Sequence, residues 1–205
     1  LLPALRDAFP QLPMIVVEDR LSADGPHIKL LKQLKYHYII VVKPSDQPSL
    51  FEEVDKRLTS GQYEELEEEG KDGIIRGYRW MNGLPLNKSH PDILVNYLDY
   101  WEIRESQEYN FAWITDSKLR RDNVYHVMRG GRSRWKIENE MFNTLKHQGY
   151  QLEHNYGHGQ KYLATVLAML MMLAFLVDLR CKSCAVIYFK RRGNNFVPEL
   201  RYGTS

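Results

Sequence analysis

The sequence predicts an α/β fold, and three observations support this class. Met14–Val17 and Tyr38–Val42 are short apolar runs of strand length, and the helical pattern Pro26–Leu34 lies between them. This order is typical of a βαβ unit, which places two parallel strands side by side. Residues 74–104 are rich in strand-forming residues, and residues 132–148 have apolar side chains at helical spacing. We therefore expect a sheet core with helices packed on it and a β-rich insertion.

The first strand is preceded by a helix end and followed by two carboxylates. Leu1–Phe9 has a helical pattern, which Pro10 and Pro13 interrupt. Glu18 and Asp19 come directly after the apolar run. Open α/β sheets bind their ligands at the carboxyl ends of parallel strands, so these carboxylates are candidates for a site.

The middle of the chain alternates helix, linker and strand signals. Ser49–Leu58 is predicted as a helix, and the acidic, Gly-punctuated stretch Thr59–Asp72 as an exposed linker. Asn-Gly within Met81–Gly83 lies between apolar runs, which predicts a hairpin there. Ile93–Arg104 and Asn110–Thr115 are predicted strands. We expect the insertion to stand apart from the core sheet.

The region after the last strand is helical. Asn123–Met128 is predicted as a short helix that ends at Gly130 and Gly131. The helix over 132–148 then starts, with an apolar stripe that should be buried on the sheet. This stripe consists of Trp135, Phe142 and Leu145.

The last part of the chain has a second apolar segment. Tyr162–Val177 is about 16 residues long, short of the roughly 20 needed to span a bilayer, so we expect Lys161–Arg180 to form a buried helix.

The two cysteines, Cys181 and Cys184, lack a second pair of ligands that a zinc site would need. This favours structural or incidental cysteines in a reducing compartment.

Charge is unevenly distributed along the chain, although the net charge is only +2. Residues 117–146 hold eight Lys and Arg against three acids, and residues 52–73 hold three against nine. The basic block suits a polyanion such as nucleic acid, and a solvated helix face is the alternative explanation. Aromatic side chains in the β-rich region are explained either by sheet packing or by stacking on bases.

The segment 134–146 resembles a known catalytic motif. Arg-Trp-x-Ile-Glu followed by Phe-x-x-Leu-Lys is similar to the last catalytic block of bacterial insertion-sequence transposases of the DDE class, in the subgroup with a Tyr–Arg–Glu–Lys signature. Arg134 matches the arginine and Glu138 the third catalytic carboxylate. The tyrosine position is occupied by Gly131, and Lys146 comes one residue later than the signature lysine.

The resemblance extends to the βαβ region, through Val-Glu-Asp, Gly-Pro-His-Ile-x-Leu-Leu and a strand that ends in Lys-Pro. It implies that Asp19 is the second catalytic carboxylate. Asp24 and Glu18 are local competitors for this role, and a turn carboxylate is the alternative for Asp19. The first Asp of the family pattern would lie upstream of Leu1, so we expect a fragment with an incomplete site that is inactive alone.

The resemblance implies an RNase H-like (retroviral-integrase-like) core with a β-rich insertion and a C-terminal buried helix. The expected divisions are 1–58 for the first part of the core, 59–106 for the acidic linker and the insertion, and 107–205 for the second part. Asp19 and Glu138 are expected to share one metal site, with carboxyl groups within roughly 4–8 Å. Without a metal, one of them is expected to turn toward Arg134.

The implied activity is metal-dependent cleavage of transposon ends and strand transfer into target DNA, with Mg²⁺ or Mn²⁺ held by Asp19 and Glu138. The expected partners are DNA and a second copy of the chain in a synaptic complex, in the bacterial cytoplasm at the nucleoid and without a membrane. Alternatives are an inactive or domesticated DNA-binding relative and a metal-dependent nuclease on the same fold. The expected DNA contacts are Arg134, Lys146, Arg132, Lys136, Phe111 and Trp113.

Overall fold

A computed structural model of the whole chain describes residues 1–70, 72–105, 107–136, 141–147, 149–150, 152–154, 157, 159 and 161–191. The chain divides into two compact units, Leu1–Arg134 and Trp135–Ser205. Each unit is described by itself.

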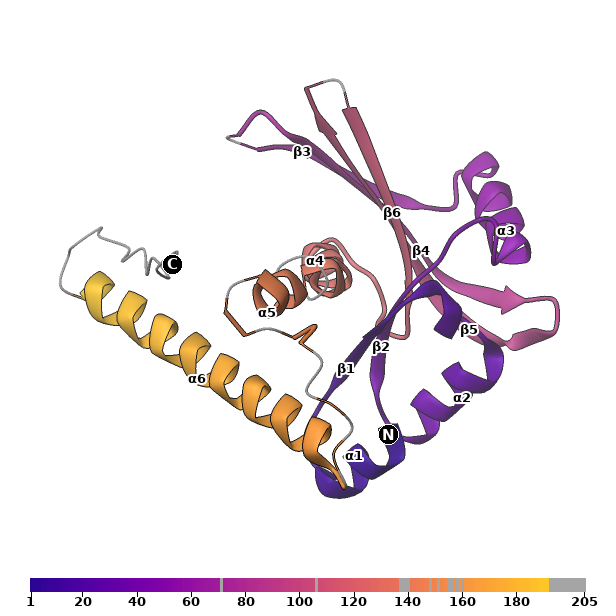
Figure 1. Cartoon of the computed structure of the whole chain (residues 1–205). Helices are drawn as coiled ribbons and strands as arrows, with labels where there is room; N and C mark the ends of the chain where they lie inside the picture. Colours follow the sequence, from indigo (N-terminus) through magenta and orange to yellow (C-terminus); the bar gives the residue numbers. More distant parts are fainter. Residues whose placement is uncertain are drawn as a thin grey trace. The chain divides into compact units, whose positions relative to one another are not determined.

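The first unit is built on one six-stranded sheet with the order β1-β2-β6-β5-β4-β3 (Figure 1). β1 and β2 are parallel, and every other neighbouring pair is antiparallel. The fold is therefore mixed α/β with a mostly antiparallel sheet. The strands are β1 (Ile15–Glu18), β2 (His37–Val41), β3 (Glu64–Glu69), β4 (Ile75–Asn87), β5 (His90–Arg104) and β6 (Gln107–Thr115).

The helices begin where the sequence provides caps or prolines. Asp24 accepts a hydrogen bond from the backbone N–H of His27 at 2.8 Å and so caps α2. Proline occupies one of the first two positions of α1, α2 and α3, where its missing N–H costs nothing. The helices are α1 (Leu2–Ala8), the 3₁₀ helix η1 (Arg20–Ser22), α2 (Gly25–Gln33), α3 (Pro48–Thr59), α4 (Val124–Lys136), α5 (Asn143–His147) and α6 (Leu163–Arg191).

The predicted βαβ unit is confirmed. β1 and β2 pair in parallel, with Glu18 opposite Ile40, and α2 connects them. α3 and the strands β5 and β6 also form where the sequence predicts them.

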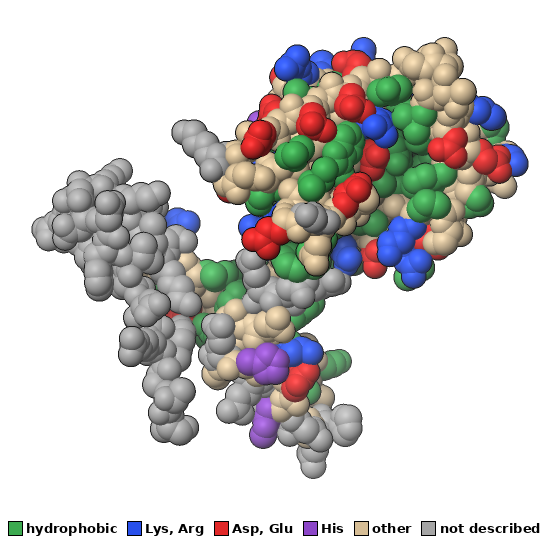
Figure 2. Space-filling view, turned by 90° about the horizontal axis from the view of Figure 1, so that it is seen from above, with side chains coloured by type: hydrophobic (Ala, Val, Ile, Leu, Met, Phe, Trp, Pro, Cys, Tyr) green, Lys and Arg blue, Asp and Glu red, His purple; other side chains and the backbone are tan. Residues whose placement is uncertain are grey.

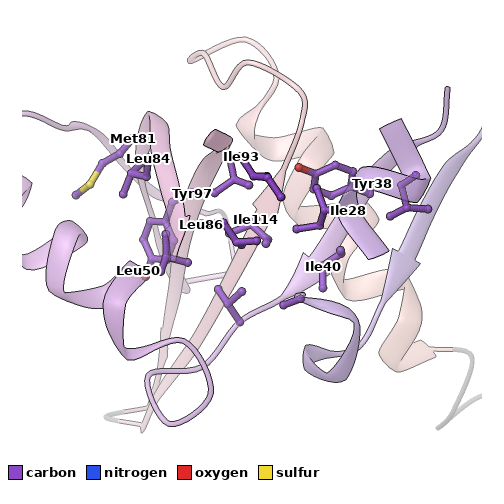
Figure 3. Packing of buried hydrophobic residues seen from close by; sticks show 14 of the residues in the cluster. Ile28, Tyr38, Ile40, Leu50, Met81, Leu84, Leu86, Ile93, Tyr97 and Ile114 are labelled. Carbon is purple, nitrogen blue, oxygen red and sulfur yellow. The ribbon is translucent and has the colours of Figure 1, made fainter. Parts of the chain in front are cut away.

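Each face of the sheet carries its own core. One core joins α2 and α3 to strand residues such as Ile40, Tyr97 and Ile114 (Figure 3). The other joins α4 to strand residues such as Ile39 and Trp113. Because consecutive strand residues point to opposite faces, α2 and α3 cover one face and α4 covers the other (Figure 1).

The sequence predicts that the β-rich region stands apart from the core sheet. In the structure it is part of that sheet. β6 pairs with β5 along one edge and with β2 along the other, so it joins the two parts into one sheet. The predicted linker also contributes a strand, β3, which pairs with β4 and places Leu66 against the α4-side core. Local patterns do not show such pairing, because the partner strands are distant in sequence.

The predicted hairpin at Asn82-Gly83 is wrong, since β4 continues through it. The register of β4 and β5 shifts between Met81 and Leu84, which marks a bulge. The Asn82 side chain exchanges two hydrogen bonds with the backbone of Leu119, at 3.0 and 2.8 Å. Gly83 has φ of +70°, which glycine adopts without strain. The Asn-Gly pair thus forms a bulge rather than a turn.

Gly130 and Gly131 do not end a helix, because α4 runs through both. A Cβ at Gly131 would lie 2.5 Å from atoms of the Trp113 ring, and one at Gly130 would lie 2.7 Å from Cδ1 of Ile39. The two glycines therefore let the helix backbone approach the sheet closely. α4 begins at Val124, so the predicted separate helices at 123–128 and from 132 are one helix up to Lys136.

The second unit contains α5, α6 and a small core. Its buried side chains are Leu145, Met171 and Phe175, and the ring of Tyr150 packs edge-on against Phe175 at 5.5 Å. Of the predicted stripe, Leu145 is buried, whereas Trp135 and Phe142 are 54% and 42% exposed.

The prediction of a buried C-terminal helix is not met in the part of the chain that the structure describes. The segment Leu163–Cys181 of α6 is 19 residues long, with a mean hydropathy of 2.0, and 6% of it is buried. The reason is that Met171 and Phe175 recur every four residues and supply one packed stripe, while apolar residues continue around the helix. By length and composition this helix could cross a membrane, which is weak evidence on its own.

Candidate functional site

Asp19 lies at the carboxyl end of the parallel pair, directly after β1. Its Oδ1 accepts a hydrogen bond from the backbone N–H of Arg20 at 2.7 Å and caps η1. The side chain is 48% exposed. The turn role considered for Asp19 is thus present, and it uses only one of the two carboxylate oxygens.

Arg134 reaches Asp19 from α4. Its Nη2 lies 3.9 Å from Oδ2 of Asp19, and both residues belong to the first unit. The two are 115 residues apart in sequence, so the contact exists only because α4 packs on the sheet face next to β1 and β2. The expectation that one carboxylate turns toward Arg134 is met by Asp19.

The two local competitors of Asp19 are occupied with other tasks. Oε2 of Glu18 lies 2.6 Å from Nε2 of His27, and this pair lies on the α2 side because Glu18 alternates with its neighbours along β1. Asp24 caps α2. A further ion pair, Arg20 with Asp46 at 2.9 Å, joins η1 to the loop after β2.

Arg132, a predicted DNA contact, is engaged with a buried carboxylate. Its guanidinium pairs with Oε1 of Glu102 and lies over the ring of Phe111, 5.0 Å from the ring centre. Glu102 is 3% exposed and also accepts hydrogen bonds from the Tyr100 hydroxyl at 2.5 Å and from Arg104 at 2.6 Å. Burial acts to raise the pKa of Glu102, but these donors outweigh it and hold the pKa below its usual value. Arg132 therefore anchors α4 to β5.

Phe111 and Trp113 stack on one another, with ring centres 5.8 Å apart. Trp113 is 2% exposed, because it is covered by α4 at Gly131, so it is not available to contact DNA in this structure. Both rings border a hollow of about 270 Å³ where β2 leaves the sheet, together with Lys43 and Asp99. Burial raises the pKa of Asp99, and Arg79, 3.9 Å away, opposes the shift.

The remaining predicted residues lie at or beyond the end of α4. Lys136 is exposed in the last turn of α4. Lys146, in α5, pairs with Glu153 at 2.6 Å. Glu138 lies outside the described residues, so its predicted distance to Asp19 stays a prediction.

The chemistry of Asp19 suits a divalent cation, since carboxylate oxygen is the ligand that Mg²⁺ and Mn²⁺ prefer. Asp19 is accessible at a strand end, and its Oδ2 is not used in capping. Within the described residues, no group of three or more His, Cys, Asp or Glu side chains is placed to hold a metal ion. A metal site at Asp19 therefore needs Glu138 or another carboxylate.

Sequence reasoning did not identify Glu102 as an organising residue. The signal was available in the strand period, because Glu102 follows the aromatic Tyr100 by two residues and so shares its face of the sheet. A carboxylate on a buried strand face requires cationic or hydrogen-bonding partners, and Arg132 and Arg104 supply them.

No protein-family model matches the chain, and no curated protein is significantly similar to it.

Proposed function

We propose that this chain is part of the catalytic core of a DDE-class DNA transposase with an RNase H-like fold. The single observation that supports the proposal best is the 3.9 Å approach of Arg134 to Asp19. The two residues belong to separate motifs, 115 residues apart, and the resemblance implies a catalytic carboxylate for Asp19 and a DNA-phosphate contact for Arg134. Folding brings them to the same strand end.

The sheet supports the same proposal at the level of architecture. The parallel β1·β2 pair places Asp19 at the carboxyl edge, where α/β sheets bind ligands. β3, β4 and β5 belong to the predicted β-rich insertion, and they extend this sheet through β6.

In the proposed site, Asp19 and Glu138 would hold Mg²⁺ or Mn²⁺ through their carboxylate oxygens. When bound, the metal supplies a Lewis acid that favours ionisation of water and neutralises charge on phosphate oxygens. Arg134 is placed to hold a phosphate of the DNA beside Asp19, because its planar guanidinium offers two parallel donors. Glu102, through Arg132, fixes α4 so that Arg134 faces the strand end.

The first experiment measures Mn²⁺ binding by electron paramagnetic resonance. We expect Asp19→Asn and Glu138→Gln each to weaken binding by about tenfold or more, since even outer-shell partners change metal affinity by that amount. Asp7→Asn, which removes an exposed carboxylate from α1, is the matched control and should bind Mn²⁺ like the unsubstituted chain. Unchanged Mn²⁺ binding by Asp19→Asn would overturn the metal site.

The second experiment tests the reaction in a protein that contains this chain and supplies all three carboxylates of the class. With Mn²⁺, this protein should cut DNA and join the freed 3′ end to a target, and Asp19→Asn should abolish both while DNA binding persists. Cutting without joining would favour a nuclease. Binding without either reaction would favour an inactive relative.

A further inference from the structure

Helix α4 presents three different surfaces along its length. Val124, Val127 and Met128 are buried against the sheet. Arg132 and Arg134 lie on the two flanks of this buried stripe, and each reaches a different carboxylate, Glu102 or Asp19. Tyr125 and Arg129 lie on an exposed surface of the helix that borders Arg132, and neither takes part in these contacts.

We call this surface the outer stripe and define it as Arg121, Tyr125 and Arg129. These residues are spaced by four, and the turn before α4 is helical, because the N–H of Val124 bonds to the carbonyl of Arg120 at 3.1 Å. All three are exposed, and Tyr125 is 48% exposed. The spacing places them on one side of the helix. Lys136, seven residues after Arg129 in α4, continues the pattern.

The outer stripe is positively charged, and few acidic residues lie near it in the sequence. Between Ser117 and Lys136 the sequence has seven Lys and Arg and one acid, Asp122. Asp122 pairs with Arg120 at 3.1 Å, outside the stripe. Among the described residues, no carboxylate lies within 4.0 Å of Arg121 or Arg129 in an ion pair.

Cations elsewhere on the first unit, both exposed and half-buried, often have carboxylate neighbours. Arg79 lies 2.7 Å from Glu65, and the same kind of pairing recurs on other elements. The face shown in Figure 2 has acidic and basic side chains interspersed among hydrophobic ones. Further pairs of this kind are Lys29–Asp92, Lys56–Glu53, Lys88–Glu52 and Arg76–Asp72. The outer stripe therefore departs from the charge pattern of the unit.

The ring of Tyr125 contacts two neighbouring side chains of α4, Arg129 and His126. The guanidinium of Arg129 lies over the Tyr125 ring, 5.8 Å from its centre, and His126 packs edge-on against the same ring at 5.7 Å. A guanidinium held on a ring loses less side-chain entropy when it binds an anion. The phenol hydroxyl adds a neutral donor between the two arginines.

We infer that the outer stripe binds the sugar-phosphate backbone of duplex DNA. Arg121 and Arg129 are eight residues apart, or about 12 Å along a helix, which spans several phosphates that rise about 3.4 Å each along one strand. Arginine and tyrosine are donors suited to phosphate oxygens. The inference deepens the proposed function, because it assigns the DNA track to a surface distinct from Asp19 and Arg134.

The test is the salt dependence of binding to a fluorescein-labelled duplex of random sequence, measured by anisotropy on the full 205-residue chain. We expect Arg121→Gln with Arg129→Gln to lower the slope of log K against log salt by about 1.8, since each lost phosphate contact removes about 0.9. The control is Lys32→Gln with Lys35→Gln, which makes the same change in net charge at exposed positions in and just after α2. The control should keep the slope of the unsubstituted chain.

The outer stripe and the Asp19 metal site can fail independently, and the outcomes below distinguish the two failures. Equal slopes for the stripe variant and the unsubstituted chain would overturn the outer stripe and leave the Asp19 metal site standing. A flattened slope together with unchanged Mn²⁺ binding in Asp19→Asn would keep the stripe and overturn the metal site. Binding to phosphatidylcholine–phosphatidylserine vesicles is the second probe. Loss of vesicle binding in the stripe variant, with DNA binding intact, would reassign the surface to anionic membranes.

Discussion

At the scale of single residues, Glu102 contributes to holding α4, the helix that carries Arg134, on the sheet. We expect Glu102→Gln to lower the free energy of unfolding by about 1–3 kcal/mol, because it weakens charged hydrogen bonds with Arg132 and Arg104. The measurement is urea unfolding at pH 7, followed by circular dichroism. Glu108→Gln, at an exposed position of β6, should leave the free energy nearly unchanged.

The pH dependence of this effect has a defined sign. The pKa of Glu102 is lowered from its ordinary 4.5 in the folded state, so its stabilisation is present above pH 4.5 and is lost as the pH falls toward the folded pKa. The difference between the unsubstituted chain and Glu102→Gln should therefore shrink below pH 4.5. A difference that grew on acidification would contradict the assignment.

At the scale of elements, the contact of α4 with the sheet depends on glycine. Gly131→Ala should lower the free energy of unfolding by about 1–3 kcal/mol, although alanine favours helices by up to about 1 kcal/mol, because its Cβ would meet the buried Trp113 ring. Gly130→Ala is the matched comparison. Its Cβ would meet the flexible end of Ile39, so the loss should be smaller. Urea unfolding followed by tryptophan fluorescence distinguishes them, and equal losses would argue against the Trp113 contact.

Elements with local signals could be predicted from the sequence. The βαβ unit was predictable because its apolar runs and its cap, Asp24, are contiguous. The position of Asp19 directly after the first strand was predictable from the same contiguous segment. The role of Gly131 could not be predicted, since its partner Trp113 is distant and glycine pairs usually interrupt helices. The joining of the β-rich region to the core sheet was missed for the same reason, because pairing of β6 with β2 is a long-range event.

At the scale of the whole molecule, the two units differ in what can stabilise them. The six strands and both large cores lie within the first unit, whereas the described core of the second consists of three buried side chains. We expect residues 1–136 to fold alone, with a cooperative urea transition, and residues 137–205 to show none, because the described residues of the second unit bury little apolar surface. A gradual, non-cooperative transition for 1–136 would show that the first unit depends on the second.

The two edge strands of the sheet, β3 and β1, differ in charge and therefore in how readily a strand of another chain could pair with them. Five of the six residues of β3 are glutamate, so a second β3 brought alongside would place like charges opposite one another. β1, at the other end of the sheet, consists of Ile15, Val16, Val17 and Glu18 and has no comparable row of charge. Growth of the sheet by added strands is therefore one-sided. Misassembly of this protein at high concentration should begin at β1, and charged substitutions there should improve its solubility.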